Sequence, residues 1–207
     1  ANSWNLSSNA TVQNELCFRY EYDGEGRMII KKVPGAGEVW MVYDARDRLV
    51  MTQDAKLRTQ PTQQWIVTKY DALNRPTETG LWNNTSNRTT HQTAAASSTS
   101  YPTTSSGYEI LSESFYDGYT YAGVKTYDAS FNSQLQSGVN LYPVTNVKSD
   151  ITTGMLTGSR VKVLGTVSQY LISSIYYDHW GRAIQTLADN QSTGVDLTTN
   201  QYDFSGK

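Results

Sequence analysis

Short stretches rich in aromatic and β-branched residues alternate along the chain with clusters of turn-forming residues. Apolar and polar residues mix within each stretch over about four to eight positions, which is typical of half-buried β-strands. The sequence therefore predicts a mainly β fold built from short antiparallel strands. Strands are predicted before turns at Cys17–Tyr22, Glu38–Tyr43, Trp65–Tyr70 and Leu171–Tyr177, and after turns at Arg27–Lys32, Arg48–Gln53, Arg75–Thr79 and Arg182–Leu187.

A six-residue turn phrase follows each incoming strand. It reads tyrosine, aspartate, two variable positions, a residue that tolerates positive φ, and then arginine or lysine. Asp is favoured at the start of a type I turn, and Gly, Asn and Asp enter the left-handed region at low cost. We therefore predict that each phrase is a hairpin tip with a G1 bulge. The five copies are Tyr22-Asp23-Gly24-Glu25-Gly26-Arg27, Tyr43-Asp44-Ala45-Arg46-Asp47-Arg48, Tyr70-Asp71-Ala72-Leu73-Asn74-Arg75, Tyr177-Asp178-His179-Trp180-Gly181-Arg182 and Tyr202-Asp203-Phe204-Ser205-Gly206-Lys207.

The spacing of the phrases indicates tandem repeats. Successive tyrosines lie 21 residues apart from Tyr22 to Tyr43, 27 from Tyr43 to Tyr70, and 25 from Tyr177 to Tyr202. A unit of this length fits one β-hairpin, which buries its faces only when neighbouring hairpins stack beside it. Within each hairpin, the tyrosine and the base lie within reach of stacking or of a cation–π contact if they share a face. The interval of 107 residues from Tyr70 to Tyr177 breaks the rhythm and holds two degenerate copies, Tyr116-Asp117 and Tyr127-Asp128.

These phrases resemble the tyrosine-aspartate (YD) repeat of the Rhs family. That family includes bacterial surface and secreted proteins, wall-associated polymorphic toxins, the cocoons of toxin complexes and the animal teneurins. The resemblance covers roughly residues 15–80 and 160–207. It implies a curved, shell-like sheet that encloses or presents a C-terminal effector domain. It also implies a secreted or surface location in a bacterium, and a longer parent chain with further repeats.

Repeat content divides the chain into four predicted segments. Residues 1–14 form a polar N-terminal segment, 15–80 carry three copies, 81–160 are divergent, and 161–207 carry two copies and are expected to be truncated at the C-terminus. Thirteen of the twenty-two residues from Thr85 to Ser106 are Ser or Thr, which predicts a surface loop with a short helix near Asn87–Ala96. Within the third segment, strands are predicted at Tyr108–Phe115 and Leu156–Gly165, and helical turns at Ala129–Gln136.

Composition narrows the range of partners. The net charge is −2 and no run of basic residues occurs, so nucleic acid is not an expected partner. No apolar stretch is long enough for a membrane-spanning helix. The single cysteine, Cys17, excludes an internal disulfide, and its apolar setting predicts a buried thiol.

The sequence contains no pattern typical of catalysis or of metal binding. Of the two histidines, His91 lies in the Ser/Thr-rich stretch and His179 in a turn phrase, and neither has zinc-ligand spacing. Gly24-Glu25-Gly26 is explained by its turn, and the chain has no Asp-Pro dipeptide, near which family members cleave themselves. We therefore expect a non-catalytic chain without cofactor or metal, in which the phrase residues act as structural turns.

An extracellular binding module that recognises glycans or a protein partner is the alternative. Exposed tryptophan faces would support it, whereas packing within the sheet would account for buried ones. The tryptophans to consider are Trp4, Trp40, Trp65, Trp82 and Trp180.

Overall fold

The computed structural model describes residues 9–104, 106–135 and 142–207. Two compact units divide the chain at the Leu111–Ser112 bond, inside strand β7 (Tyr108–Tyr116). None of the boundaries between the four segments predicted from repeat content lies at this bond. Those four segments stay a prediction. Each unit is described by itself.

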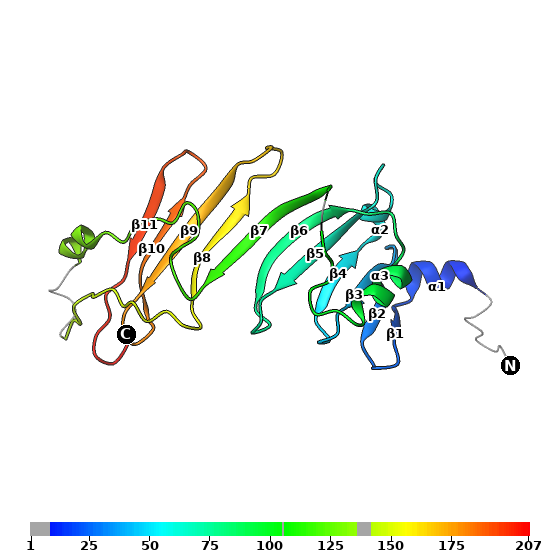
Figure 1. Ribbon diagram of the computed structural model, residues 1–207, viewed down its shortest axis with the longest axis horizontal. Coiled ribbons are helices and arrows are strands. Elements are labelled where there is room, and N and C mark those ends of the chain that lie inside the picture. The colour runs from blue at the N-terminus through cyan, green and yellow to red at the C-terminus, as the bar shows by residue number, and fades with distance from the viewer. Residues whose placement is uncertain (1–8, 105, 136–141) are drawn as a thin grey trace. The chain divides into compact units, whose positions relative to one another are not determined.

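The first unit is an antiparallel sheet in which strands pair in sequence order (Figure 1). Asn9 begins helix α1 (Ala10–Leu16), because its side chain accepts a hydrogen bond from the Val12 amide. A second short helix, α2 (Ala55–Arg58), joins two strands, and a third, α3 (Arg88–Ala95), follows the last strand. The strands are β1 (Arg19–Tyr22), β2 (Met28–Lys32), β3 (Val39–Tyr43), β4 (Leu49–Gln53), β5 (Gln64–Tyr70) and β6 (Pro76–Asn83).

Helix α3 covers the core of the first unit. Its His91 and Ala95 are buried, and the His91 ring lies 4.8 Å from the Trp65 ring, edge to face. Tyr101, beyond the helix, hydrogen-bonds the His91 Nδ1 at 2.6 Å. The core strands contribute Val42, Val50, Met51, Trp65 and Val67, against which Trp40, Tyr70, Trp82, Tyr101 and Tyr108 pack.

The second unit is also an antiparallel sheet with strands paired in sequence order. A long excursion between its first two strands contains a short 3₁₀ helix, η2 (Ala129–Gln134). Tyr176, Ile184 and Leu187 form the core, and Tyr119 and Tyr127 of the excursion pack against it together with Leu197 and Tyr202. The strands after β7 are β8 (Leu156–Lys162), β9 (Tyr170–Tyr177), β10 (Ala183–Asp189) and β11 (Val195–Thr199).

The mainly β fold of antiparallel hairpins predicted from the sequence is confirmed. The predicted helical turns at 129–136 correspond to η2, with residue 136 outside the described part. Sequence patterns missed α1, α2 and β11. Among the described residues, no helix is both long enough and apolar enough to cross a membrane.

Two local expectations are corrected by the structure. The short helix predicted near Asn87–Ala96 corresponds to α3, whose N-cap Asn87 accepts the Thr90 amide, but the Ser/Thr-rich stretch is not only a surface loop, since α3 buries two side chains in the core. Cys17 is half-buried and ends α1, outside β1. Its predicted strand begins two residues later, at Arg19, so the thiol is not a core residue.

Candidate functional site

The turn phrases are the most repeated feature of the chain, and all five have the same backbone geometry. In each, the Asp amide donates to the carbonyl of the final base, and the fifth residue's amide donates to the Asp carbonyl, at 3.0–3.1 Å. The fifth residue has positive φ in every copy: Gly26 78°, Asp47 59°, Asn74 63°, Gly181 78° and Gly206 84°. A side chain that strains this backbone would therefore disturb the hairpin tip.

The Asp side chain stabilises the turn by accepting hydrogen bonds from its backbone amides and, in four phrases, from the arginine. Asp44 shows the pattern: its Oδ1 accepts the amides of Arg46 and Arg48 at 2.9 and 3.0 Å, and its Oδ2 accepts Arg48 Nε at 2.8 Å. The two amide contacts recur in all five phrases, and the arginine Nε contact recurs at 2.7 Å in the phrases of Asp23, Asp71 and Asp178. In the four phrases that end in arginine, both carboxylate oxygens thus accept hydrogen bonds from their own turn.

The electrostatics of the phrase favour ionised aspartate. Burial by itself would raise the pKa of Asp44, which is fully buried, but the Arg48 side chain and the amides of Arg48 and Arg46 outweigh it and lower the pKa. The pKa of Asp178 is lowered in the same way, with burial opposed by the Arg182 amide and guanidinium. A carboxylate with this environment does not act as a proton acceptor near neutral pH.

Arginine and tyrosine of different phrases connect neighbouring hairpins. The Arg48 guanidinium lies 5.0 Å from the ring centre of Tyr70, which belongs to the next phrase. The Tyr70 hydroxyl in turn donates to the carbonyl of Leu49 at 3.0 Å. The same two contacts link Arg27 and Met28 to Tyr43 at 5.2 and 2.7 Å, and Arg182 and Ala183 to Tyr202 at 4.7 and 3.1 Å.

The sequence predicts a contact between tyrosine and base of one hairpin if the two side chains share a face; in these three phrases the base instead lies over the tyrosine of the next phrase. The guanidinium group bonds the aspartate of its own phrase and also reaches the next turn. The tyrosine ring that it contacts therefore belongs to the following phrase. Arg48 also donates to the Asp71 carbonyl at 3.3 Å and to Asn74 Oδ1 at 3.1 Å. The phrase is therefore both a turn and an inter-repeat connector.

A sixth phrase is present but split. Tyr116 pairs with Leu156 across a bulge, as each phrase tyrosine of the complete hairpins pairs with the residue after its base. The Asp117 amide donates to the Met155 carbonyl at 3.1 Å, its Oδ1 accepts the Gly154 amide at 2.6 Å, and Gly154 has φ 83°. Residues 118–153 stand where the other copies have two residues.

The next hairpin makes the same tyrosine contact to the split phrase as to a complete one. The Tyr177 hydroxyl donates to the Leu156 carbonyl at 2.6 Å, the contact that the other phrase tyrosines make to the preceding hairpin. Met155 occupies the place of the arginine. The sequence identified Tyr116-Asp117 as a degenerate copy, but not Gly154-Met155 as its second half, because the two halves are far apart along the chain. The second degenerate copy is not a hairpin tip, since Asp128 caps η2 and Tyr127 packs on Tyr176.

In each unit one long segment leaves the sheet: the segment between β6 and β7 in the first unit and the one between β7 and β8 in the second. Both segments, called excursions here, hydrogen-bond the backbone of phrase tyrosines. In the first unit, the side-chain amide of Gln92 accepts the Tyr43 amide at 3.0 Å and donates to the Tyr43 carbonyl at 2.9 Å. In the second unit, the Tyr177 carbonyl accepts the Ser149 amide, and the Tyr202 carbonyl accepts the Val144 amide, both at 2.8 Å. The buried Gln185 completes the attachment by binding the amide and carbonyl of Asp128, each at 2.9 Å.

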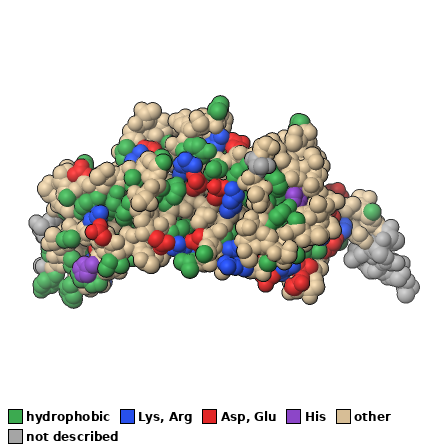
Figure 2. All heavy atoms as spheres, in the orientation of Figure 1, with side chains coloured by type: hydrophobic (Ala, Val, Ile, Leu, Met, Phe, Trp, Pro, Cys, Tyr) green, Lys and Arg blue, Asp and Glu red, His purple; other side chains and the backbone are tan. Residues whose placement is uncertain are grey.

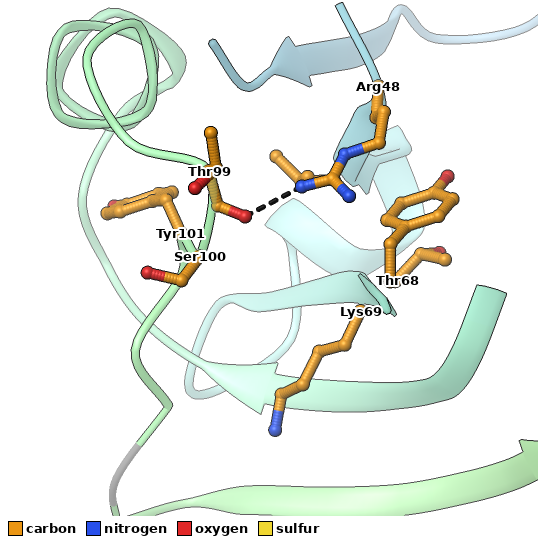
Figure 3. Close-up of a pocket in the computed structure, with 8 residues that line it drawn as sticks. Arg48, Thr68, Lys69, Thr99, Ser100 and Tyr101 are labelled. Atoms are coloured by element: carbon orange, nitrogen blue, oxygen red, sulfur yellow. Dashed lines mark hydrogen bonds between the residues drawn. The ribbon is translucent and has the colours of Figure 1, made fainter. Parts of the chain in front are cut away.

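A hollow of about 150 Å³ lies beside the second phrase, between Arg48, Lys69 and Tyr101 (Figure 3). Arg48 bonds Asp44 and the next turn, and its Nη2, which also donates to Asp44, donates to the Thr99 carbonyl at 2.6 Å, the dashed line of Figure 3. Lys69 pairs with Glu78 at 2.7 Å. With both cations already paired, the hollow has no group that marks it as an anion site.

The residues considered for chemistry lie apart. His91 is buried in the first core, and burial lowers its pKa to about 4, so it is neutral at pH 7. His179 is exposed beside Trp180. Within the described ranges, no group of three or more His, Cys, Asp or Glu residues is placed to hold a metal ion.

The tryptophans divide between core and surface. Trp65 is fully buried, and Trp40 and Trp82 pack against the same core. Trp180 is 58% exposed in the fourth phrase, where the Arg182 guanidinium lies 4.5 Å from its ring centre. Trp4 lies outside the described residues. Among the four described tryptophans, Trp180 thus presents the most exposed indole, at one turn of the second unit.

No family model and no curated protein matches the sequence. Solved structures that the fold is similar to include the crystal structure titled TcdB2-TccC3-TEV, with 12% identity and a TM-score of 0.25 over 92% of this chain. Another is TcdB2-TccC3 without its hypervariable C-terminal region, with 14% identity and the same TM-score over 92% of this chain. In each case this chain spans 10% of the length of the matched chain.

Proposed function

We propose that the chain is a non-catalytic structural repeat segment of an Rhs-type surface or secreted protein. The observation that carries this proposal is the repeated arginine–tyrosine connection between successive hairpins. In three phrases the arginine bonds the aspartate of its own turn and lies over the tyrosine ring of the next phrase. A chain whose most repeated residues are occupied in this way is suited to building an extended sheet.

The finer parts of the proposal come from the resemblance of the phrases to the YD repeat. The sheet contributes to a shell that encloses or presents a C-terminal effector domain, within a longer bacterial protein that is secreted or displayed on the cell. Nucleic acid is not among the proposed partners. On the face seen in Figure 2, basic and acidic side chains lie beside one another, and the net charge is −2.

Hydrogen exchange of the intact chain tests the structural role. Replacing Arg48 by Met removes the link to the next hairpin, and we expect faster exchange in β4 and also in β5 and the turn at Asp71. Lys56→Met is the matched control, because Lys56 is an exposed base in α2 outside any phrase. Loss of protection confined to the hairpin of Arg48 would contradict a connector role.

A binding module remains the second candidate, and the exposed Trp180 is the observation that favours it. Its ring is held by Arg182, which is itself fixed by Asp178 at 2.7 Å and by the Asp203 carbonyl at 3.1 Å. A rigid aromatic surface of this kind suits the apolar face of a sugar ring. Titration with a panel of soluble glycans should quench Trp180 fluorescence if this function holds. Unchanged emission, or equal quenching in Trp180→Ala, would count against it.

A further inference from the structure

Helix α3 is held on the first unit by few side chains. Its eight residues include three threonines, which are weak helix formers, and a helix of this length is marginal in water on its own. Its buried side chains are those of His91 and Ala95. The docking of α3 on the sheet therefore depends strongly on His91, the larger of the two.

The His91 ring has aromatic surroundings that suit its neutral form. Its ring centre lies 4.8 Å from that of Trp65, 5.8 Å from that of Trp82 and 6.1 Å from that of Tyr101. Nδ1 has the Tyr101 hydroxyl as its partner at 2.6 Å, whereas Nε2 is buried and has no hydrogen-bond partner among the described residues. The protonated ring carries an N–H on both nitrogens, so its charge would be buried with one donor unpaired, at a high cost in free energy.

The charged groups around α3 do not offset this cost. Besides the bases that hold carboxylates, the cations are Arg58, 4.1 Å from the Trp40 ring centre, and Arg88, the first residue of α3. The described residues thus offer the imidazolium no carboxylate, and burial lowers the pKa of His91 to about 4. The carboxylates on the sheet face beneath α3 are each bonded elsewhere: Glu38 by Trp40 Nε1 at 3.0 Å, Asp44 by Arg48 Nε at 2.8 Å and Glu78 by Lys69 at 2.7 Å.

We infer that α3 is an acid-responsive cover: protonation of His91 releases the helix and the residues after it, up to Tyr101, while the hairpins beneath stay paired. The neutral ring is accommodated among aromatic side chains, whereas the imidazolium is stabilised by leaving them for water. Release uncovers the rings of Trp65 and Trp82. The inference goes beyond the proposed structural role, since it concerns how the first unit responds to acid.

Two amides of the sheet report on release, because their partners lie in the released segment. The Tyr43 amide donates to Gln92 Oε1 at 3.0 Å, and the Ala45 amide donates to the Ser98 carbonyl at 3.1 Å. The hairpin β5–β6, in contrast, is held by its own backbone ladder over the whole of β5. Release therefore frees the two reporter amides without opening β5–β6.

Native-state hydrogen exchange of the intact chain, followed by NMR between pH 7 and 4.5, tests the inference. His91 has a pKa of about 4 when docked and an ordinary 6.5 once released, so docking weakens as the pH falls below 6.5. After correction for the intrinsic rate, we expect the protection of the reporter amides to fall roughly fiftyfold over this range. At pH 4.5 they should be at least about tenfold less protected than β5–β6 and nearly insensitive to low urea, since local release exposes little surface.

Histidine variants complete the test. His91→Phe keeps a buried ring that cannot titrate, so the loss of protection with acid should vanish, and His91→Leu serves the same purpose with a smaller side chain. His179→Phe is the matched control, because His179 is exposed in the second unit, and it should keep the loss. The inference would be overturned if reporters and β5–β6 shared one exchange rate and one urea dependence, or if the loss persisted in either His91 variant.

Discussion

The two units attach an excursion to the same kind of hairpin ladder in opposite ways. In the first unit the excursion follows the completed hairpin β5–β6, and its Gln92 reaches the backbone of Tyr43 in the sheet. In the second unit the excursion interrupts the hairpin β7–β8 at its tip, and Gln185 of the sheet reaches the backbone of the excursion. The hairpin ladder is kept with either kind of excursion, because its contacts come from the turn backbone and the phrase side chains.

The split phrase shows which part of the turn is needed. Its tyrosine, aspartate and left-handed glycine are kept, while the two variable positions are replaced by residues 118–153 and the base by Met155. Strand pairing and the Tyr177 contact persist. The variable positions are thus the place where a repeat accepts added chain.

The largest loss of stability is expected when a phrase ion pair is broken, and this loss should differ between the two units. Asp44 is fully buried and Arg48 is covered by Thr99 of the excursion, whereas Arg182 is partly open. We expect Asp44→Ala to lower the free energy of unfolding by about 3–5 kcal/mol, because Arg48 would lose its buried partner. Asp178→Ala should cost less. Urea unfolding measures the loss of unfolding free energy in each variant, and hydrogen exchange assigns it to a unit. Equal losses in the two variants would show that the excursion does not cover the Asp44–Arg48 pair.

Acid should weaken the first unit before the second. The folded pKa of His91 is about 4 against an ordinary 6.5, so the unfolded chain binds this proton more readily. The resulting stability is complete above pH 6.5 and is lost as the pH falls toward 4, by about 3 kcal/mol in total. The phrase aspartates titrate below this window, since their pKa values lie under 3.8. In His91→Phe the pH dependence between 6.5 and 4 should flatten; an unchanged slope would assign it to other groups.

The two glutamine attachments should differ in strength. Gln185 is fully buried and Gln92 is half-buried. Replacing Gln185 by Leu leaves the Asp128 amide and carbonyl unpaired, for which we expect a cost of about 1–3 kcal/mol. Gln92→Leu should cost less, since water reaches its site more easily. A reversed order in thermal melts would mean that the excursion of the second unit is held mainly by its other contacts.

The smallest of these contrasts concerns the left-handed glycines. Gly26 and Gly181 both have φ 78°, so valine at either position strains the turn, by about 1–3 kcal/mol. A side chain at Gly181 also meets Met155, whose Cε lies 2.9 Å from the new Cβ, whereas Gly26 faces open space. We expect the larger loss for Gly181→Val in a denaturant melt. Unchanged stability of both variants would contradict the turn assignment.

Local chemistry explains what could be predicted from the sequence. Each phrase encodes its own turn, because Asp23 and Gly26, for example, satisfy requirements set within six residues. The pairing of Arg48 with Tyr70 was not predictable in this way, since it depends on how one hairpin sits beside the next. The burial of His91 was missed because its Ser- and Thr-rich surroundings signal a loop, and the aromatic cluster that receives it comes from distant strands.

The central claim is that arginine of one phrase couples to tyrosine of the next. A double-mutant cycle with Arg48→Met and Tyr70→Leu measures this coupling directly in urea unfolding, with Arg48→Met and Tyr43→Leu as the control cycle within one hairpin. We expect a coupling of about 1 kcal/mol for Arg48 and Tyr70, and less than about 0.5 kcal/mol for Arg48 and Tyr43. Equal couplings, or a larger one within the hairpin, would contradict the account.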